Sequence, residues 1–414
     1  MDVRSDVVAS LYRQKAGFSL ERPFYTAEEV HRLDLETAFY REWLFAGHEC
    51  ELQDSGSYLT LQLGDYPLLI VRDACGTIRA FHNACRHRGS RLCSADRGKL
   101  AKLVCPYHQW TYELDGRLLF ARDMGPEFEA EGFGLKRVHC ETLAGYVFVC
   151  LAETPPDFAS FRAVAEPYLA PHGLADAKVA YETTIVEKGN WKLVWENNRE
   201  CYHCAGNHPE LCRTFPDTPT LTNPTGDVAD PGVLRLWDRC RSLGLPSGFA
   251  ISPDAQYRLT RLPLLRDAES YTLSGKRAVK RPLSASVDAA DIGALLLYHY
   301  PSTWNHVLVD HAVSFRVVPL GPQETAVTTK WLVHKDAVEG VDYDRQTLTE
   351  VWEATNDQDR QVVEENQRGI NSPAYEPGPY SPVHEAAVIQ FVDWYRSILE
   401  QRLRDEVPVA TRVA

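Results

Sequence analysis

Apolar and polar residues alternate in short runs along the chain between about residue 48 and residue 149. Residues 58–63, 67–71 and 146–150 are such runs, and turn-forming segments such as 73–76 and 114–117 lie between them. An alternation of this kind places every second side chain on the same face of a strand. The pattern predicts a compact antiparallel β domain of about 100 residues.

The pattern changes on both sides of this segment. Before it, residues 27–45 have the pattern of a helix. After a linker at 151–157, helical patterns cover 190–204, 344–369 and 384–403, and strand-like runs lie at 295–300, 306–310, 313–318 and 325–334. Residues 209–285 are rich in Pro and Gly, which is typical of long loops over a site. Strands followed by long helices predict an α+β fold.

These patterns divide the chain into three parts. We expect a helical segment at 1–46 that packs on the second domain, a small antiparallel β domain at 47–152, and a larger domain at 153–414. The larger domain should have an antiparallel sheet flanked by helices.

Composition narrows the function classes. The 414 residues are 44% hydrophobic, so the chain can bury a sizeable core, and the net charge of −13 argues against nucleic acid as a partner. No apolar run is long enough to cross a membrane, and residues 1–6 lack an export signal, so we expect a cytoplasmic protein. The 11 Cys are odd in number, and clustered Cys and His in a reducing compartment indicate metal ligands.

Two short motifs pair a thiol with an imidazole. Cys85-Arg86-His87 is followed, after 17 residues, by Cys105-Pro106-Tyr107-His108. Two Cys and two His could hold zinc, but zinc sites usually pair Cys with Cys and His with His. One Cys and one His in each motif is the arrangement of a Rieske [2Fe–2S] cluster, in which two Cys bind one iron and two His bind the other.

A second group of candidate ligands lies in the predicted helix 190–204. At 100° per residue its two faces are Trp191, Val194, Trp195 and Asn198 on one side and Glu196, Glu200 and His203 on the other. His208 follows Gly206-Asn207, where the chain can leave the helix and reach the same ion. Two histidines alone are also compatible with a pair on the surface.

The long predicted helix at 344–369 supplies a candidate carboxylate. Its apolar face consists of Leu348, Trp352, Thr355, Val362 and Val363, and Asp359 falls in the middle of that face. A lone carboxylate on a buried face needs a partner or a metal, so we predict that Asp359 is a ligand. Asp357, Glu364 and Glu365 lie off this face and are expected in solvent.

The motifs together resemble those of the Rieske-type non-haem iron oxygenases, the ring-hydroxylating alpha-subunit superfamily. Residues 83–89 and 105–110 are similar to the two Rieske boxes, and 190–208 and 356–360 to the mononuclear-iron boxes. The resemblance implies a helix-grip catalytic domain, a [2Fe–2S] cluster on Cys85, His87, Cys105 and His108, and an Fe(II) ion on His203, His208 and Asp359. It also implies O₂ as co-substrate, Glu200 as the bridge for electrons between the centres, and a homotrimer.

The resemblance also points to a substrate class. Most of the superfamily has Asp where this chain has Glu200, and Glu there is similar to the subgroup that acts on choline, carnitine and betaines. Residues 298–306 and 332–344 resemble the betaine demethylases. This implies hydroxylation of an N-methyl carbon and loss of formaldehyde, with glycine betaine favoured as the substrate. Proline betaine (stachydrine), then choline or carnitine, then an aromatic ring are the alternatives.

Substrate and electron donor each imply further residues. A quaternary ammonium group favours aromatic faces, and the candidates are Tyr298, Tyr300, Trp304 and Tyr257, each of which could equally be a core residue. No dinucleotide fingerprint is present, so electrons must come from a separate NAD(P)H reductase. Residues 83–117 carry seven basic and three acidic side chains, and we hypothesise that this patch, including Arg91 and Lys99, docks the reductase.

Two other classes fit parts of the pattern. A Rieske ferredoxin-type electron carrier would need only about 100 residues, and the remaining chain with its three candidate ligands argues against it. A di-iron protein would use Glu-x-x-His motifs, and such motifs occur at 28–31 and 200–203. That fold requires a four-helix bundle, however, and strands are expected in much of this chain.

Overall fold

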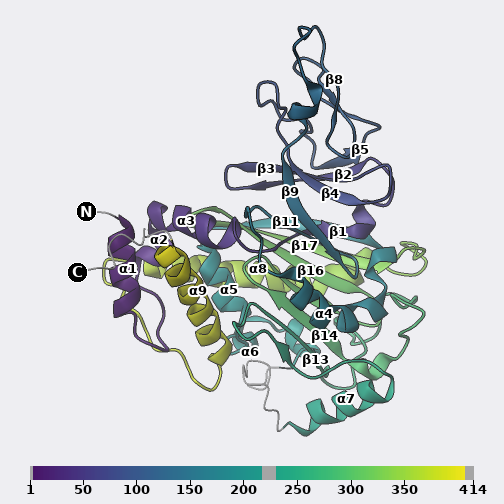
Figure 1. Cartoon of the computed structure of the whole chain (residues 1–414). Helices are drawn as coiled ribbons and strands as arrows, with labels where there is room; N and C mark the ends of the chain where they lie inside the picture. The colour runs from purple at the N-terminus through teal and green to yellow at the C-terminus, as the bar shows by residue number, and fades with distance from the viewer. Residues whose placement is uncertain (1–2, 217–229, 406–414) are drawn as a thin grey trace.

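Two antiparallel sheets of seven strands each organise the chain, and a third sheet of three strands lies at one end (Figure 1). The computed structural model describes residues 3–216 and 230–405. The smaller β domain projects from one side of the larger domain, with β8 at its tip. Antiparallel sheets with flanking helices were predicted for the larger domain, and this α+β fold is confirmed.

The smaller domain is built on the first sheet, whose strand order is β1-β10-β9-β4-β3-β2-β5. Its strands are β1 Leu44–His48, β2 Ser57–Leu63, β3 Tyr66–Arg72, β4 Ile78–His82, β5 Arg97–Lys99, β9 Arg137–Leu143 and β10 Tyr146–Cys150. The three-stranded sheet consists of β6 Leu103–Val104, β7 Thr111–Tyr112 and β8 Leu118–Phe120. The runs predicted at 58–63, 67–71 and 146–150 are therefore strands.

The helix expected at 27–45 is shorter than predicted. Helix α3 covers Glu28–Asp34, a π-helical turn covers Leu35–Phe39, and residues 44–48 form β1, which pairs with β10. All five residues of β1 are buried. A continuous apolar run fits a buried strand as well as a buried helix, so periodicity alone could not separate the two.

The larger domain is built on the second sheet, with the order β11-β17-β16-β15-β14-β13-β12. Its strands are β11 Ala177–Glu187, β12 Ala250–Ile251, β13 Tyr257–Leu262, β14 Ala294–His299, β15 Thr303–Val307, β16 Ala312–Gly321 and β17 Glu324–His334. Strand β13 and helix α7 (Pro231–Ser242) lie in the stretch 209–285 that was expected to be irregular. All six residues of β13 are buried, polar ones included, so no alternation marks it. Residues 217–229 of that stretch lie outside the described part.

The remaining helices surround this sheet. They are α1 Val3–Arg13, α2 Pro23–Thr26, α4 Phe158–Leu169, α5 Trp191–Asn198, α6 Cys204–Asn207, α8 Arg345–Ile370 and α9 Ala386–Asp405. Short 3₁₀ turns lie at Glu49–Glu51, Ala130–Phe133, Ala170–His172, Leu174–Asp176, Leu211–Arg213 and Ala290–Ile292. No helix in the described ranges is long and apolar enough to cross a membrane.

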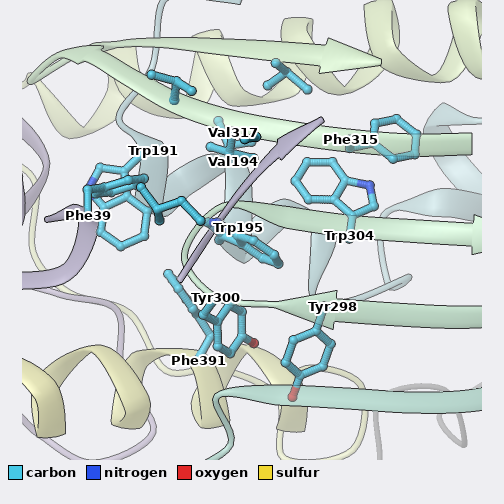
Figure 2. Close-up of a cluster of buried hydrophobic side chains, with 14 of the residues drawn as sticks. Phe39, Trp191, Val194, Trp195, Tyr298, Tyr300, Trp304, Phe315, Val317 and Phe391 are labelled. Atoms are coloured by element: carbon cyan, nitrogen blue, oxygen red, sulfur yellow. The ribbon is translucent and has the colours of Figure 1, made fainter. Parts of the chain in front are cut away.

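Aromatic packing fixes α5 between the sheet and α9. Trp195 packs edge-on against Tyr300 and Trp304 from the sheet and stacks on Phe391 from α9 (Figure 2). Trp191 contacts Phe391 as well. Helix α5 leads directly to the candidate iron ligands, so this core sets their position.

Buried polar groups tie both ends of the chain to α5. The Asp34 carboxylate accepts hydrogen bonds from Trp191 Nε1 at 2.9 Å and Tyr395 Oη at 2.7 Å, and it pairs with the buried Lys192 ammonium. Lys192 therefore has a counter-ion, which a buried charge requires. Helices α3, α5 and α9 meet at this carboxylate.

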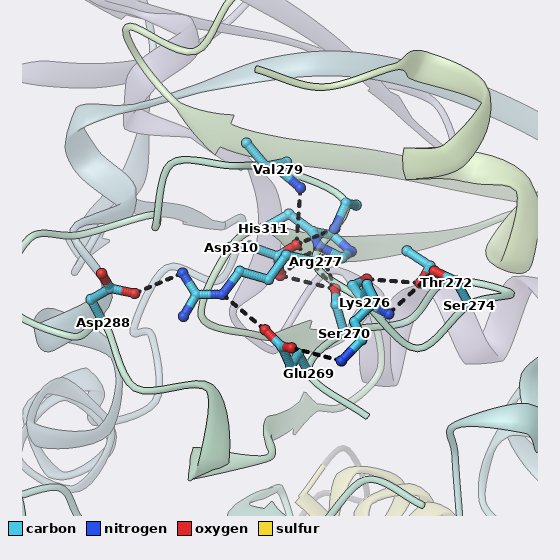
Figure 3. Close-up of polar contacts among 11 residues, drawn as sticks. Glu269, Ser270, Thr272, Ser274, Lys276, Arg277, Val279, Asp288, Asp310 and His311 are labelled. Atoms are coloured by element: carbon cyan, nitrogen blue, oxygen red, sulfur yellow. Dashed lines mark hydrogen bonds and ion pairs between the residues drawn. The ribbon is translucent and has the colours of Figure 1, made fainter. Parts of the chain in front are cut away.

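A polar network orders the segment between β13 and β14. Asp310 accepts hydrogen bonds from Ser270 Oγ at 2.9 Å and from the Val279 backbone N–H at 3.1 Å, while Arg277 pairs with Glu269 at 3.4 Å (Figure 3). Asp310 is fully buried, and these bonds satisfy its charge. The segment thus follows a defined path over the sheet despite its loop-like composition.

Candidate metal centres and the adjoining pocket

The two Cys-His motifs form loops with the same backbone geometry. In each loop the cysteine N–H, of Cys85 or Cys105, donates to the carbonyl five residues further on at 2.8 Å. The residue four places after the cysteine returns a hydrogen bond to the cysteine carbonyl, at 2.9 Å in the first loop and 3.0 Å in the second. That residue has a positive φ in both cases: 80° at Gly89 and 59° at Gln109. Each loop is a tight turn that needs a left-handed residue at that point.

The four candidate ligands meet at the tip of the smaller domain. Cys85 and Cys105 are buried, His87 is exposed, and the rings of His87 and His108 have their centroids 4.7 Å apart. Nδ1 of His108 is buried and has no hydrogen-bond partner among the described residues. An inner pair of thiols, an outer pair of imidazoles and an unpaired ring nitrogen fit the donor set of a Rieske cluster.

Neighbouring side chains hold these ligands in place. Tyr112 Oη accepts the Arg86 backbone N–H at 3.0 Å and lies 3.3 Å from Cys85 Sγ, to which it can donate. Trp110 stacks on the His87 ring at a centroid distance of 4.9 Å. Burial raises the pKa of the Cys85 thiol, so a metal is needed to hold it as a thiolate there.

The second group of ligands converges on one point. His203 Nε2 lies 2.9 Å from His208 Nε2, and Asp359 Oδ1 lies 3.3 Å and 3.0 Å from these two nitrogens. Donors bound at right angles to one ion at about 2.1 Å are about 3.0 Å apart. Asp359 Oδ1 is buried and receives no hydrogen bond of normal geometry from a described residue. The three atoms fit one face of a metal ion, with the other face left for small ligands.

The second ring nitrogen of each imidazole, Nδ1, also has a hydrogen-bond partner. His203 Nδ1 lies 2.5 Å from Glu200 Oε1, and His208 Nδ1 lies 2.9 Å from Gln358 Oε1. Gln358 Nε2 donates in turn to Glu210 at 2.8 Å. An N–H donated from Nδ1 leaves Nε2 as a free acceptor for a metal. Gln358 and Glu210 were missed by the sequence reasoning, although Gln358 adjoins Asp359 within 356–360.

Charge at this centre favours a cation. Burial alone would lower the pKa of His203, but the neighbouring Asp359 and Glu200 carboxylates raise it to about 10. Two carboxylates next to one imidazole therefore stabilise a positive charge on it or beside it. A divalent metal between the three donors would supply that charge instead of protons.

The helix predicted at 190–204 is interrupted, which corrects one part of the sequence analysis. Helix α5 ends at Asn198, residues 200–203 form a turn, and α6 begins at Cys204. Glu196 consequently does not share a face with Glu200 and His203. It accepts hydrogen bonds from Tyr25 Oη at 2.8 Å and Tyr380 Oη at 2.9 Å instead. The turn lets both histidines and Glu200 approach Asp359.

A cavity that is open to solvent adjoins this centre. Its lining includes Asn198, Glu200, Phe215, Tyr298, Trp304 and His306. A smaller cavity shares Asn198 and Trp304 with it and includes Asp359. The larger cavity thus lies next to the predicted iron ligands.

Two of the four aromatic candidates line this cavity and two do not. Tyr298 and Trp304 are register partners on β14 and β15 and face the cavity. Tyr257 is in register with His299, one residue beyond Tyr298, and the strand alternation turns it to the opposite face. Tyr300 follows β14 and is fully buried against Trp195. Tyr257 and Tyr300 are therefore core residues at these positions.

Much of the basic charge in 83–117 is neutralised within the chain. Four of the seven basic side chains form ion pairs: Arg97 with Glu182, Lys99 with Asp54, Lys102 with Glu113, and Arg117 with Asp115. Arg88 and Arg91 are exposed close to His87. The free part of the patch is smaller than the sequence suggested.

Family models match both parts of the chain. The Rieske [2Fe–2S] domain model matches residues 42–138, and the ring-hydroxylating alpha subunit (catalytic domain) model matches residues 174–401. The chain is 49% identical over 403 residues to the glycine betaine monooxygenase oxygenase subunit of Pseudomonas aeruginosa PAO1, covering 96% of this chain and 93% of that protein. With the Chromohalobacter salexigens protein of the same name it shares 50% over 409 residues, covering 97% and 91%.

More distant relatives share the fold. The carnitine monooxygenase oxygenase subunit of Acinetobacter pittii is 31% identical, over 47% of this chain and 53% of that protein. The crystal structure of the quaternary ammonium Rieske monooxygenase CntA with L-carnitine superimposes with a TM-score of 0.68 at 21% identity, covering 93% and 97% of the two chains. Naphthalene 1,2-dioxygenase from Rhodococcus sp. gives 0.70 at 18% identity, covering 98% and 99%.

Proposed function

The chain belongs to the family of Rieske non-haem iron oxygenases with a ring-hydroxylating alpha-subunit catalytic domain, and from this premise we propose that it demethylates glycine betaine. The observation that carries the proposal is identity near 50% along more than 90% of each chain with two glycine betaine monooxygenase oxygenase subunits. The carnitine relative matches at 31% over about half of this chain. The product would be dimethylglycine, with formaldehyde released.

We propose that His203, His208 and Asp359 hold the Fe(II) ion. Their donor atoms lie within 3.3 Å of one another, which supports this assignment. Glu200 and Gln358 would fix the two imidazoles through their Nδ1 atoms. Iron bound there would supply O₂ activation, while the cavity beside it would hold the N-methyl group.

We propose that Cys85, His87, Cys105 and His108 hold the [2Fe–2S] cluster. The matching loop turns and the unpaired His108 Nδ1 support this assignment. The cluster would store one electron.

We also propose that the domains divide at residues 46 and 152, and that residues 1–46 pack on the catalytic domain. The contact between α1 and α9 supports this division.

Electrons are proposed to pass between subunits of a homotrimer, from His108 of one chain to Glu200 of the next. In Figure 1 the tip with β8 points away from α6, so a route within one chain would be long. Exposed apolar side chains at the tip support a docking face there: Val104, Tyr107, Leu119 and Phe120. Co-expressed Cys105→Ser and His208→Ala chains should then regain activity in mixed oligomers.

Two electrons per turnover are proposed to come from a separate NAD(P)H-dependent reductase. The docking patch proposed for it is narrowed to Arg88 and Arg91, because Lys99 is already paired with Asp54 at 2.9 Å. Charge reversal at Arg91 should weaken the salt dependence of cluster reduction, and an unchanged dependence would reject the patch. We propose the cytoplasm as the location, because a reducing compartment keeps cysteines such as Cys85 and Cys105 available as metal ligands.

Formaldehyde release in the presence of a reductase tests the proposed function. Glycine betaine, proline betaine, carnitine and choline are compared at equal concentration, with iron and acid-labile sulfide measured on the same sample. The highest kcat/KM with glycine betaine, together with three irons and two sulfides per chain, supports the proposal. A preference for another of the four substrates would reassign the substrate, and two irons without sulfide would refute the oxygenase assignment.

A further inference from the structure

We propose that Arg199 and Arg258 form an anion site at one end of the larger cavity, where they bind the substrate carboxylate and so select a betaine over choline. The identity of the substrate rests on the proposed function. The anion site itself follows from the charges and contacts around these two side chains.

Both guanidinium groups lie on one aromatic ring. Cζ of Arg199 is 4.0 Å from the Tyr298 ring centroid, and Cζ of Arg258 is 5.3 Å from it. Arg258 and Tyr298 are register partners on β13 and β14, and all three residues line the cavity. Two cations are thereby fixed on the same wall of the cavity.

Neither guanidinium has a counter-ion in the described part of the chain. Arg258 is 5% exposed and Arg199 is 7% exposed, and no hydrogen bond or ion pair with a described residue engages either side chain. Nη1 of Arg258 and both Nε and Nη2 of Arg199 are buried without a partner. Buried charges of this kind are normally paired.

Arg261, on the same strand, provides a contrast. It is fully buried, yet its Nε donates to the Pro246 carbonyl at 3.1 Å and its Nη2 to His172 Nε2 at 2.7 Å. Arg261 is thus held by two hydrogen bonds within the fold, and only its Nη1 is buried without a partner among the described residues. Arg199 and Arg258 retain donors that no residue in the described part of the chain engages.

The acidic residue in the cavity lining, Glu200, is engaged elsewhere. Its Oε1 lies 2.5 Å from His203 Nδ1, and its Oε2 accepts the backbone N–H groups of Tyr202 and His203. Burial and the charge of Arg199 lower the pKa of Arg258 to about 10, so the side chain is still a cation at neutral pH. Two unpaired cations in a buried wall make an anion the complementary ligand.

A carboxylate is the anion that this geometry suits. Guanidinium groups bind carboxylates through paired N–H donors, and such charge-assisted bonds are stronger where water is excluded. A betaine bound by its carboxylate would extend its quaternary nitrogen into the rest of the cavity, toward Trp304, which the smaller cavity with Asp359 shares. Choline has a hydroxyl in place of the carboxylate and could not use these donors in the same way.

Two ligands test the two ends of the substrate separately. 3,3-Dimethylbutanoate is the carbon analogue of glycine betaine, with the carboxylate but no positive charge, and choline has the charge but no carboxylate. Their binding to the iron-loaded enzyme is measured by calorimetry, for the wild type and for Arg258→Met and Arg199→Met. Each variant should bind glycine betaine and 3,3-dimethylbutanoate ~30-fold more weakly or worse, because a buried charge partner is lost. Binding of choline should change by less than about threefold.

Stability measurements exclude a merely structural role. Arg258→Met removes an unpaired buried charge, so the ligand-free variant should melt at or above the wild-type temperature. Arg261→Met is the matched control, and it should melt lower while the ratio of glycine betaine to choline affinity stays unchanged. Arg258→Lys should recover part of the affinity. Equal losses for choline and glycine betaine in Arg258→Met, or a lower melting temperature with unchanged affinities, would overturn the anion site.

The same measurements keep the two proposals apart. If glycine betaine yields no formaldehyde but 3,3-dimethylbutanoate still requires Arg258, the demethylase assignment fails and the anion site stands. If glycine betaine is demethylated with the same KM in Arg258→Met and in the wild type, the anion site fails and the assignment stands.

Discussion

The two candidate metal centres are assembled in opposite ways. The four ligands of the first lie within residues 85–108, in two loops that repeat one backbone turn. The three ligands of the second centre are spread from residue 203 to residue 359. His203 and His208 flank the short helix α6, and Asp359 lies in the middle of the long helix α8. The first centre depends on local backbone conformation, whereas the second depends on the packing of the whole larger domain.

Removing one ligand from each centre should show that the two are independent. His208→Ala is expected to abolish turnover and leave the visible absorption of the cluster intact, because only the second centre loses a donor. Cys105→Ser should do the reverse, with loss of the cluster spectrum and retention of mononuclear iron. Absorption spectra and iron content measure both. Loss of the cluster spectrum in His208→Ala would place His208 at the wrong centre.

Acid should separate the two domains by stability. Burial lowers the pKa of His172 and His306 to about 3 and of His299 to about 4, all in the larger domain. Below about pH 6.5 these histidines bind protons in the unfolded chain but not in the folded chain, so the free energy of unfolding falls as the pH decreases. The expected loss is about 2 kcal/mol per histidine between pH 6.5 and pH 5.

Denaturant titrations at pH 7 and pH 5 measure this loss, with tertiary circular dichroism reporting on the larger domain. Among the described residues of the smaller domain, burial lowers the pKa of one histidine, His48, as far as about 4, against three in the larger domain. The cluster absorption should therefore persist to higher denaturant at pH 5 than the larger domain's signal. His172→Gln serves as the control, and its pH slope should be shallower. An equal loss in both domains would remove the contrast.

Loss of the contact that orients His208 should have an effect of intermediate size on iron binding or turnover. Gln358→Leu removes the acceptor of the His208 Nδ1 proton, and it should weaken iron binding or turnover by about 10- to 100-fold. Iron titration of the metal-free enzyme measures the affinity. Gln361→Leu is a matched control, because Gln361 bonds to the exposed Asp357 four residues away. Equal effects of the two substitutions would argue against a specific role for Gln358.

The smallest effect is expected in the loop turns of the first centre. Gly89 has a φ of 80° and open space where a Cβ would lie, so Gly89→Ala should cost about 1 kcal/mol through backbone strain alone. Gly76, at 85° in a hairpin turn, provides the control with the same strain. Both alanine variants should lose similar stability in denaturant, and Gly89→Ala alone should shift the cluster spectrum. An unchanged spectrum would mean that the turn does not position the ligands.

The sequence predicted the local centre more completely than the dispersed one. Four candidate ligands in two short motifs can be recognised without tertiary information. Asp359 was also singled out, because an isolated carboxylate on an apolar helix face is unusual, and its Oδ1 lies 3.0 Å from His208 Nε2. Gln358 was missed because its role depends on an imidazole from a segment 150 residues earlier, which no local pattern encodes.

The fold was predicted best where one face of an element is buried. Strands such as β2, β3 and β17 alternate or are strongly apolar, whereas β13 buries Arg258, Thr260 and Arg261 and gave no strand signal. The same buried polar residues supply the proposed anion site. Tyr257 lies away from the cavity because it is in register with His299, and residues adjacent in a strand face opposite sides of the sheet. Tyr300 lies beyond the end of β14 and packs against Trp195, which composition cannot reveal.

The order of the strands has a consequence for synthesis on the ribosome. The smaller domain contains all of its own strands once residue 150 has emerged, so it can fold and receive its cluster while the rest is still being made. Strand β11 must wait for β17, and α5 must wait for α9 near the end of the chain. The two cofactors are therefore expected to enter in sequence, the cluster first and the single iron after translation ends.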